Sequence, residues 1–469
     1  MADQEFDVVV IGAGPAGEVA AGRCSGAGLE TAIIEVELVG GECSYWACMP
    51  SKGLLRPGEI LAEVAAVPGA AEKADKKPDA AAALRRRNEI VTEWDDSGQL
   101  PWLDDAGVKL IRGRARFQGP RRMEVEHADG TRETVTARRS VIVATGSHPA
   151  IPPIDGLRDM RVWGNREATA AQEAPRRLIV LGGGPVGVEM AQAWVTLGAE
   201  EVTLIEAAGR LLPREEPFAG EELAASMKSQ GIRVLTGTSV VKASRHDDEG
   251  PVTVTLEDDS TITGDEVLVA VGRRPNTGDL GLDTIGLEAG SYVEVDDRMR
   301  ALHVKGDWLY AIGDVNGRAL LTHIGKYQGR IAADDILGAP GAFTEERAIP
   351  RVTFTHPQIA AVGLTHAQAV ERGIRARSVS TDISEVAGSS VTGVGVSGKV
   401  QATFDADREV MVGATFTGPG VADMVHAATI AIVGEVPIDR LKHAVPSFPT
   451  VSEVWLDLIE SFESSGGES

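Results

Sequence analysis

Two stretches of the chain repeat one pattern of apolar and small residues. A β-branched run over residues 6–11 predicts a buried strand, which leads into the glycine turn G-A-G-P-A-G at residues 12–17 and then into a small-residue stretch that favours a helix. An apolar run over residues 31–34 predicts a second strand, which ends at Glu35. A dinucleotide-binding fold requires this order of strand, glycine turn, helix, strand and acidic residue.

The second copy lies in the middle of the chain. An apolar run over residues 177–181 leads into the glycine turn G-G-G-P-V-G at residues 182–187, and after a helical stretch the run over residues 202–205 ends at Glu206. The acidic residue follows the first glycine by 23 positions in one copy and 24 in the other. A single G-x-G-x-x-G is compatible with a tight turn that binds nothing, whereas two copies in full context predict two nucleotide sites. There the glycines let the backbone approach a pyrophosphate, the helix N-terminus offers unpaired N–H groups, and the carboxylate accepts ribose hydroxyls.

Composition sets the remaining limits. The 469 residues, 43% hydrophobic and 25% charged, are typical of a globular protein of about three domains. A net charge of −23 disfavours nucleic acid and anionic lipid as partners. No apolar run approaches the roughly 20 residues that cross a bilayer, and the acidic start lacks the basic region of a secretory signal, so we expect a cytoplasmic protein without membrane contact.

The stretch 70–87 predicts a solvated, largely helical segment without a chemical role, and the tail 464–469 is expected to be disordered.

The three cysteines are too few for a disulfide scaffold, and we predict no metal site. Cys43 and Cys48 lie five positions apart in the segment C-S-Y-W-A-C-M-P-S-K, after the strand that ends at Glu35. Two cysteines at this spacing can close a small loop if the intervening residues are partly helical, and such a disulfide beside a nucleotide site would be catalytic. Spacing alone leaves a pair of buried thiols as the alternative. Cys24, among small residues of the predicted first helix, is expected to pack in the core.

Further motifs occur in a fixed order along the chain: A-T-G at residues 144–146, V-G-R-R-P-N-T at 271–277, A-I-G-D at 311–314 and F-T-H-P-Q-I-A-A-V-G-L at 354–364. With the glycine turns and the cysteine segment, they make nearly the whole chain resemble the pyridine nucleotide–disulfide oxidoreductases. That family includes dihydrolipoamide dehydrogenase, glutathione reductase, mercuric reductase and the 2-ketopropyl-coenzyme M carboxylase. The resemblance implies an α/β fold with two Rossmann-like dinucleotide-binding domains, for FAD and NAD(P), and a C-terminal α+β dimerisation domain.

Composition predicts two domain boundaries, a proline-rich crossing at residues 149–153 and a linker at residues 338–341, and the resemblance adds the domain roles and cofactor contacts. It implies FAD-binding parts at residues 1–150 and 274–345, an NAD(P)-binding domain at 151–273 and an interface domain at 346–469, in a homodimer whose active site is shared between subunits. In the FAD site, backbone atoms near residues 113–115 would meet the adenine and Asp314 the ribityl chain. The implied contacts to FAD are Gly12, Gly14, Pro15, Ala16, Gly17, Glu35, Lys52, Gly113, Ala115, Thr145, Gly146 and Asp314, and those to the nicotinamide nucleotide are Gly182, Gly184, Val186, Gly187, Glu206 and Gly272.

The same resemblance implies the roles of the redox residues. Cys48 would be the charge-transfer thiol facing the flavin, and Cys43 the interchange thiol facing the substrate. Lys52 would lie near flavin N5 and pair with Glu189, since a buried ammonium needs a counter-ion. Electrons would pass from the nicotinamide through FAD to the disulfide and then to an acceptor.

The nicotinamide nucleotide is predicted from the second copy of the pattern. Glu206 would accept the ribose hydroxyls of NAD(H) and repel the 2′-phosphate of NADP(H), so NAD(H) is favoured. Arg210 could reach a phosphate, although pairing with Glu206 or Glu215 also explains its presence.

Near its C-terminus the chain departs from the family. The disulfide reductases carry His-Pro-Thr-x-x-Glu there, whereas this chain has Phe448 in place of the histidine and keeps the glutamate as Glu453. Phenylalanine neither accepts a proton nor stabilises a thiolate. His443 and His323 are the nearest candidate substitutes, and Trp46 either packs or narrows the substrate channel.

We therefore expect an FAD-dependent NAD(P)H oxidoreductase with a Cys43–Cys48 disulfide, acting on a disulfide or another small oxidised acceptor. A quinone- or dye-type flavin reductase and an enzyme like the 2-ketopropyl-coenzyme M carboxylase are alternatives, and a regulatory flavoprotein without turnover is another.

Overall fold

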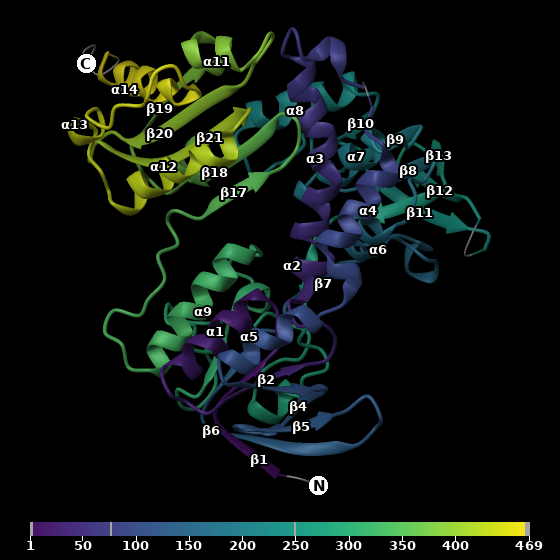
Figure 1. The fold of residues 1–469 in the computed structure, drawn as a ribbon, viewed down its shortest axis with the longest axis vertical. Coiled ribbons are helices and arrows are strands. Elements are labelled where there is room, and N and C mark those ends of the chain that lie inside the picture. Colours follow the sequence, from purple (N-terminus) through teal and green to yellow (C-terminus); the bar gives the residue numbers. More distant parts are fainter. Residues whose placement is uncertain (1–2, 76, 248–249, 465–469) are drawn as a thin grey trace. The chain divides into compact units, whose positions relative to one another are not determined.

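The structure, a computed structural model, describes residues 3–75, 77–247 and 250–464 (Figure 1). The predicted disorder of the tail 464–469 is wrong at Ser464, which ends the helix Val454–Ser464, and residues 465–469 lie outside this range. The chain divides into two compact units that are described separately. The first consists of Met1–Pro50, Asn88–Ala150 and Gly272–Thr344, and the second of Ser51–Arg87, Ile151–Val271 and Glu345–Ser469.

A seven-stranded sheet forms the centre of the first unit, in the order β3–β2–β1–β6–β5–β4, with β16 paired to β6. Strands β3, β2, β1, β6 and β16 pair in parallel, whereas β4 and β5 form antiparallel pairs. Parallel strands covered on both faces need continuous apolar runs, and Val8, Val9 and Val10 are fully buried. The strands are β1 (Asp3–Ile11), β2 (Thr31–Glu35), β3 (Val108–Arg112), β4 (Arg114–Gly119), β5 (Arg122–Glu126), β6 (Arg132–Val143) and β16 (Leu309–Ala311).

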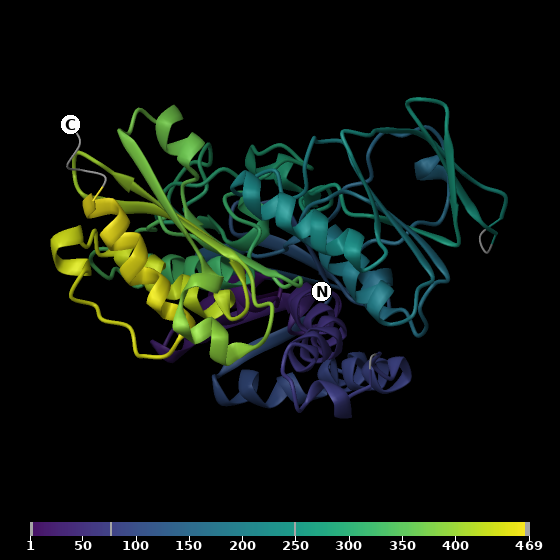
Figure 2. The same ribbon diagram turned by 90° about the horizontal axis from the view of Figure 1, so that it is seen from above.

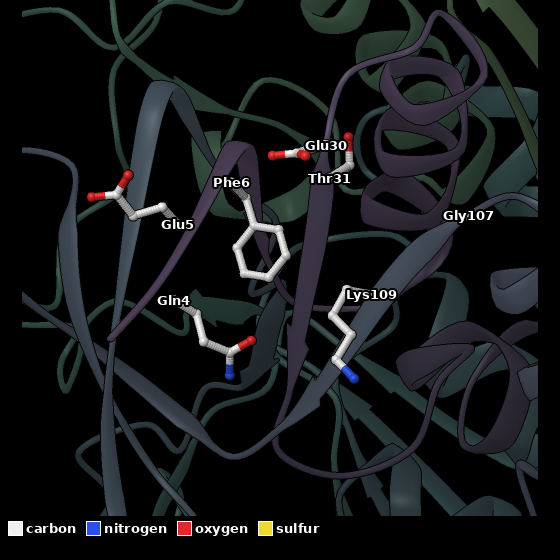
Figure 3. A pocket seen from close by; sticks show the side chains of 7 residues that line it. All are labelled: Gln4, Glu5, Phe6, Glu30, Thr31, Gly107 and Lys109. Atoms are coloured by element: carbon white, nitrogen blue, oxygen red, sulfur yellow. The ribbon is translucent and has the colours of Figure 1, made fainter. Parts of the chain in front are cut away.

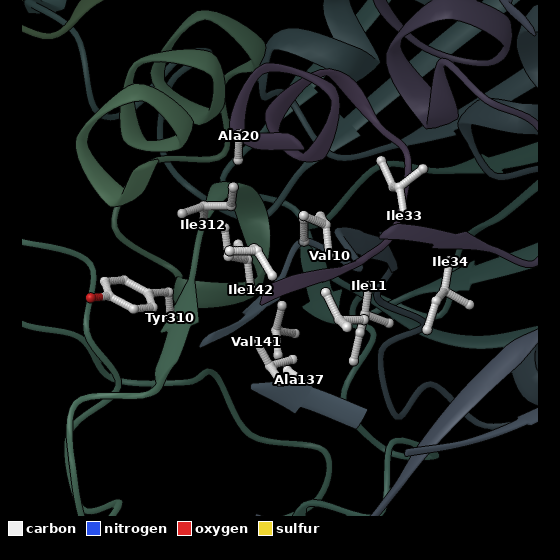
Figure 4. Packing of buried hydrophobic residues seen from close by; sticks show 14 of the residues in the cluster. Val10, Ile11, Ala20, Ile33, Ile34, Ala137, Val141, Ile142, Tyr310 and Ile312 are labelled. Carbon is white, nitrogen blue, oxygen red and sulfur yellow. The ribbon is translucent and has the colours of Figure 1, made fainter. Parts of the chain in front are cut away.

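Helices α1 (Pro15–Gly26) and α9 (Thr322–Ile336) lie against each other in this unit (Figure 1). Gly329 makes the close approach possible, because a Cβ on it would lie 2.7 Å from the backbone oxygen of Ala16. Figure 4 shows Ala20 of α1 above the buried strand residues Val10 and Ile142. The other elements of the unit are α2 (Gly41–Tyr45), α5 (Leu100–Asp105), the paired strands β7 (Ser147–Pro149) and β15 (Arg273–Pro275), and the 3-10 turns η2 (Thr92–Trp94), η3 (Ser97–Gln99), η5 (Leu282–Ile285) and η6 (Gly313–Asn316).

The second unit contains a parallel sheet of four strands in the order β10–β9–β8–β14. A separate antiparallel sheet of β11, β12 and β13 belongs to the same unit. The strands are β8 (Arg177–Leu181), β9 (Glu201–Glu206), β10 (Arg233–Thr236), β11 (Val240–Arg245), β12 (Val252–Leu256), β13 (Thr261–Gly264) and β14 (Glu266–Val269), and the helices are α6 (Asn165–Ala170), α7 (Pro185–Thr196), α8 (Pro217–Ser229) and η4 (Leu157–Asp159). The strands and helices predicted around both glycine turns are therefore present as β1, α1, β2, β8, α7 and β9.

The C-terminal part of the second unit is an antiparallel sheet of five strands in the order β17–β18–β21–β20–β19. Helices α12 and α14 pack on it and share one apolar core with its strands (Figure 2). The elements are β17 (Pro350–Thr353), β18 (Gln358–Gly363), α10 (His366–Glu371), β19 (Ala376–Asp382), η7 (Ile383–Glu385), α11 (Ala387–Thr392), β20 (Lys399–Asp405), β21 (Val410–Gly418), α12 (Val421–Val433), α13 (Ile438–Leu441), η8 (Val451–Glu453) and α14 (Val454–Ser464). The predicted α/β class, with two Rossmann-like folds and an α+β C-terminal part, is confirmed.

The segment between the cysteines and β3 contains α3 (Cys48–Ala65), η1 (Ala71–Lys73) and α4 (Ala80–Ile90). The prediction of a solvated helix here is wrong at Arg87, which is fully buried. Its guanidinium donates to the backbone oxygens of Thr169 and Ala171. A buried arginine is stable only when its donors are satisfied, so Arg87 holds residues 80–87 of α4 within the second unit.

Candidate active site

The first glycine turn joins β1 to α1. A Cβ on Gly12 would lie 2.4 Å from the backbone oxygen of Ala144, and one on Gly17 would lie 2.0 Å from the backbone oxygen of Gly12, so both positions require glycine. A Cβ on Gly14, by contrast, would meet no described atom within 4 Å. It is the N-cap of α1, Pro15 and Ala16 form the first turn, and no side chain caps the helix. This helix start can therefore receive a pyrophosphate.

Glu35 ends β2 directly beside this turn. Its Oε2 accepts the backbone N–H of Ala13 at 2.7 Å and its Oε1 that of Glu37 at 2.7 Å. Burial raises the pKa of its carboxyl. Gly113 donates its backbone N–H to the backbone oxygen of Glu35 at 2.9 Å, and Ala115 lies buried in β4. The first unit thus brings together the residues predicted for the adenosine part of FAD.

Asp314 lies in η6, after β16, and accepts the Ser147 hydroxyl at 2.5 Å. Burial raises the pKa of the Asp314 carboxyl. Thr145 donates its hydroxyl to the backbone oxygen of Asn276 at 2.9 Å. Asn276 in turn donates its backbone N–H to the backbone oxygen of Gly146 at 3.0 Å. These bonds join the A-T-G motif to the segment that follows Gly272. The open face at Gly14 and the carboxylates of Glu35 and Asp314, all in one unit, fit FAD.

The cysteine segment packs on the first glycine turn. Gly40 donates its backbone N–H to Ala13 at 2.8 Å, and α2 starts at Gly41 with Cys43 as its third residue. The predicted partly helical connection is present, since α2 carries Cys43 and α3 begins at Cys48. Tyr45 is buried and donates its hydroxyl to the oxygen of Val39 at 3.1 Å.

Trp46 of the same segment lies against Tyr45, with the two ring centroids 5.7 Å apart. The Trp94 indole N–H donates to the backbone oxygen of Tyr45 at 3.2 Å. The predicted packing contact of Trp46 is thus present against Tyr45.

The sulfurs of Cys43 and Cys48 are both thiols. The hydrogen bond with Cys48 and then burial raise the pKa of the Cys43 thiol, while Thr322 and Lys326 act to lower it. The Cys48 Sγ lies 3.3 Å from Oγ1 of Thr322, the first residue of α9. Sequence reasoning missed Thr322, and its position directly before the candidate His323 was the available signal.

Lys52 and Glu189 form the predicted ion pair within the second unit. Lys52 Nζ lies 2.8 Å from Glu189 Oε2, and Glu189 Oε1 accepts the backbone N–H of Phe354 at 2.9 Å. The Phe354 ring centroid lies 4.8 Å from Lys52 Nζ, a cation–π contact that the sequence did not reveal. Glu189 is 4% exposed, so its charge is balanced by Lys52 rather than by solvent.

The second glycine turn repeats the geometry of the first. A Cβ on Gly182 would lie 2.5 Å from the backbone oxygen of Ala270, one on Gly187 would lie 1.9 Å from that of Gly182, and Gly184 faces open space. Glu206 accepts the backbone N–H groups of Gly183 at 2.5 Å and Ala208 at 2.6 Å. Val186 is exposed in the first turn of α7.

Arg210 and Gly272 were also considered from the sequence for the nicotinamide nucleotide. Arg210 donates to the backbone oxygens of Glu215 and Pro213, both at 2.8 Å, and so contacts neither of the carboxylates considered for it. Gly272 has φ +148° and accepts the backbone N–H of Ala150 at 2.9 Å in the first unit.

The C-terminal departure from the family lies on the surface of the second unit. Phe448 is 77% exposed, and His443 is exposed as well. Glu453 Oε2 accepts the backbone N–H of Gly388 at 3.2 Å. His323, the other candidate substitute, is an exposed residue of α9 in the first unit.

A surface hollow of about 420 Å³ is lined by residues of the first unit (Figure 3). Gln4 and Phe6 of β1, Thr31 of β2 and Lys109 of β3 lie near the amino ends of these parallel strands. Nucleotides bind such sheets at the carboxyl ends of the strands, where both glycine turns lie, so this hollow is a separate surface feature. Among the described residues, no cluster of His, Cys, Asp and Glu could hold a metal ion, and no helix is long and apolar enough to cross a membrane.

Two dinucleotide-binding folds and a pair of adjacent thiols define a nucleotide-dependent thiol oxidoreductase. Residues 6–333 match the family model described as pyridine nucleotide-disulphide oxidoreductase, and residues 349–459 match the dimerisation domain of the same family. The chain belongs to the pyridine nucleotide-disulphide oxidoreductase family. The prediction of an enzyme with FAD and a nicotinamide nucleotide, NAD(P)H, as cofactors is thereby confirmed.

Several known proteins are similar over nearly the whole chain. A dihydrolipoyl dehydrogenase of Thermus scotoductus is 33% identical, covering 97% of each chain, and a mercuric reductase of Staphylococcus aureus is 30% identical, covering 96% of this chain and 81% of the relative. Among solved structures, a Cu(II) complex of a mutant of RclA, an HOCl-induced flavoprotein disulfide reductase from Escherichia coli, matches with a TM-score of 0.85 and 26% identity over 97% of this chain and 99% of the other. LpdA from Mycobacterium tuberculosis matches with a TM-score of 0.85 and 25% identity over 98% and 99%.

Proposed function

We propose that this flavoprotein disulfide oxidoreductase uses Cys43 and Cys48 as its redox couple and passes electrons from NADH to a disulfide or another small oxidised acceptor. The observation that carries the proposal is the contact of the two thiols with each other, on a segment packed against the first glycine turn. Bound FAD supplies the hydride and two-electron chemistry that links the nicotinamide to the thiols. Cys48 is the thiol on the flavin side and Cys43 the interchange thiol, while Lys52 and Glu189 act as a charge pair near the flavin.

The preference for NAD(H) over NADP(H) rests on two contacts. Both oxygens of Glu206 are aligned by backbone N–H groups at the second glycine turn, where they can accept ribose hydroxyls and repel a 2′-phosphate. Arg210, the one nearby cation considered from the sequence, already donates to two backbone oxygens.

The working form is a cytoplasmic homodimer in which the segment around Phe448 acts on the disulfide of the partner subunit. The dimerisation domain and the exposed apolar side chains of Ile430, Val433, Val445 and Phe448 support this proposal. In this proposal, residues 1–150 and 274–345 bind FAD, residues 151–273 bind NAD(P), and residues 346–469 form the dimer interface.

Phe448 limits the choice of acceptor. Without a histidine at this position, the thiolate that leaves an acceptor disulfide lacks a proton donor, and loss of a general acid or base slows a reaction by roughly 10²–10⁴-fold. Transfer from the flavin to a quinone or dye does not need this group, so we propose such acceptors as the second candidate class. Mercury reduction is disfavoured, because it needs metal-binding thiols beyond the redox pair. Cys24 is the one remaining cysteine, and burial raises the pKa of its thiol to about 12.

An anaerobic titration tests the proposal. The FAD-loaded protein should take up two electron pairs from NADH or dithionite and show a flavin–thiolate absorbance after the first. Cys48→Ser should remove this long-wavelength band, whereas Cys43→Ser should show it without NADH. Complete reduction by a single pair would mean that the thiols are not redox-active, and the proposal would fail.

A further inference from the structure

Helix α7 holds the segment between β17 and β18 through two side chains on one of its faces. Glu189 and Gln192 lie three residues apart on α7, so they project from the same side of the helix. Glu189 Oε1 accepts the backbone N–H of Phe354 at 2.9 Å, and Gln192 Oε1 accepts that of His356 at 2.7 Å. The Gln192 amide also donates to the backbone oxygen of His356 at 3.0 Å. Side chains of α7 therefore bond to the backbone of this segment at two alternate residues.

Gln192 is a buried residue that no step of the proposed function uses. It is 5% exposed, and a buried amide is costly unless its donors and its acceptor have partners. Its Nε2 donates to Gln230 Oε1 at 3.0 Å as well as to His356. Ser226 of α8 donates its hydroxyl to the same His356 oxygen at 2.6 Å, and Gln230 donates to the Ser226 hydroxyl at 3.1 Å. This closed network fixes the Gln192 amide on the backbone of His356.

Phe354 is the residue of this segment that contacts Lys52. The centroid of its ring lies 4.8 Å from Lys52 Nζ, which Glu189 Oε2 approaches to 2.8 Å and Ser51 Oγ to 3.3 Å. A lysine side chain is long and flexible, so an ion pair with one carboxylate leaves the ammonium free to turn about that carboxylate. A cation–π contact restricts this motion, because the ammonium gains energy only while it stays near the ring.

We infer that Gln192 is a positioning residue for Lys52: it holds the backbone of His356 on α7, and the Phe354 ring, two residues earlier, then keeps the ammonium in place on Glu189. One face of α7 thus supplies the counter-ion of Lys52 directly and the ring that covers the ammonium indirectly. Gln192 acts through Phe354, and both side chains belong to the second unit, as does Lys52.

The consequence for catalysis rests on the proposed function, in which Lys52 lies near the flavin. A fixed positive charge there makes the flavin easier to reduce, because reduction adds electrons to it. An ammonium that moves away from this position stabilises the reduced flavin less. Phe354 and Gln192 should therefore influence the flavin potential although neither has been assigned a contact with the cofactor.

Lysine acetylation tests the inference without any redox step. The FAD-loaded protein is treated with a low concentration of acetic anhydride, and the peptides that contain Lys52 and Lys242 are quantified by mass spectrometry. Lys242 belongs to the same unit, and its side chain is 60% exposed, so it is the reference lysine. Phe354→Leu should raise the rate at Lys52 relative to Lys242 by about threefold to tenfold, because the ring no longer holds and covers the ammonium. Phe354→Tyr keeps an aromatic ring and should react like the wild type.

The second arm concerns Gln192. Gln192→Met keeps a long unbranched side chain without the polar atoms, so it should raise the rate at Lys52 by about twofold to fivefold. Hydrogen exchange of the backbone amides of residues 354–356 should become about threefold to tenfold faster in this variant. Gln172→Leu is the matched control, since it removes an exposed amide of the same unit that donates to the backbone oxygen of Ala170, and it should change neither rate.

The double variant Phe354→Leu/Gln192→Met separates a positioning role from a general loss of stability. If Gln192 acts through the ring, the double variant should react at Lys52 no faster than Phe354→Leu alone. Additive effects would overturn the inference, because Gln192 would then act on Lys52 by another route. Equal acetylation of Lys52 in the wild type and in Phe354→Leu would also overturn it, as would an equal rise at Lys242.

The midpoint potential of the flavin distinguishes this inference from the proposed function. Phe354→Leu and Gln192→Met should lower the potential, and Phe354→Tyr should leave it at the wild-type value. Faster acetylation of Lys52 together with an unchanged potential would uphold the positioning by Gln192 and Phe354. The same result would contradict the proposed place of Lys52 and Glu189 near the flavin.

Discussion

A Cβ on Gly41 would lie 2.7 Å from the Cα of Gly14. The helix that carries Cys43 therefore starts in direct backbone contact with the second glycine of the dinucleotide turn. Gly41 also has φ +59°, a conformation that favours glycine. The position of the thiols and the shape of the FAD site consequently depend on the same contact.

Gly41→Ala should weaken FAD binding and destabilise the first unit. The added methyl would displace either α2 or the glycine turn, and overpacking of this kind costs about 1–3 kcal/mol, which corresponds to roughly tenfold in affinity for each 1.4 kcal/mol. FAD content after dialysis and the thermal unfolding midpoint measure the effect. Gly26→Ala is the control, since a Cβ there would meet no described atom within 4 Å. Full FAD occupancy in Gly41→Ala would show that α2 can shift without disturbing the turn.

Glu189→Ala should lower the free energy of unfolding of the second unit by about 2–4 kcal/mol, because it leaves the backbone N–H of Phe354 and the Lys52 ammonium without their shared acceptor. Glu189→Gln should cost less, since the amide oxygen can still accept from Phe354. Urea denaturation followed by the fluorescence of the buried Trp163 and Trp194 measures the difference.

Glu200→Ala is the matched control for Glu189. Glu200 is paired with Arg176 on the surface, with side chains 62% and 68% exposed, and we expect a change of about 0–1 kcal/mol. Equal effects of Glu189→Ala and Glu200→Ala would contradict a structural role for the buried pair.

Glu206→Ala should raise the KM for NADH about tenfold and reduce the preference for NADH over NADPH, since a charged hydrogen bond contributes about 1.5–3 kcal/mol. Arg210→Ala should change neither constant much, because its guanidinium donates to backbone oxygens. Steady-state kinetics with both nucleotides separate the two. Selective loss of NADPH turnover in Arg210→Ala would show that this arginine recognises a phosphate.

The wild-type enzyme should reduce a quinone or dye far faster than lipoamide. Phe448→His should raise lipoamide reduction by roughly 10²-fold or more and leave quinone turnover nearly unchanged, because only thiol–disulfide exchange needs the new imidazole. Glu453 can orient that imidazole, and Phe448→Leu serves as the control without a proton-transfer group. Rapid lipoamide reduction by the unmodified protein would mean that another group, such as His443, already supplies the proton.

Local patterns were sufficient to predict the two dinucleotide folds. Residues 6–35 and 177–206 each contain the complete order of apolar run, glycine turn and acidic end, and the corresponding strands and helices are present. The pairing of Lys52 with Glu189 was expected from the resemblance and is observed at 2.8 Å. The roles of these residues in catalysis stay predictions.

Other features had no local signal. Thr92, Glu93 and Trp94 all have positive φ values, between 49° and 56°, although none is a glycine, so no sequence rule predicts this left-handed turn. It brings the Trp94 indole to the backbone of Tyr45. Arg87 likewise sits in a stretch that is polar enough to suggest solvent, yet its partners lie more than eighty residues away in the sequence.

By itself, the sequence determined the α/β class, the two nucleotide sites and the cysteine pair, because glycine turns, apolar periodicity and residue spacing are local properties of the chain. The tertiary structure decided which groups meet, such as Thr322 beside Cys48 and Phe354 over Lys52. Each of these contacts joins residues more than a hundred positions apart or on different helices. Its energy depends on burial and on the distance between charges, and only the folded chain sets these quantities.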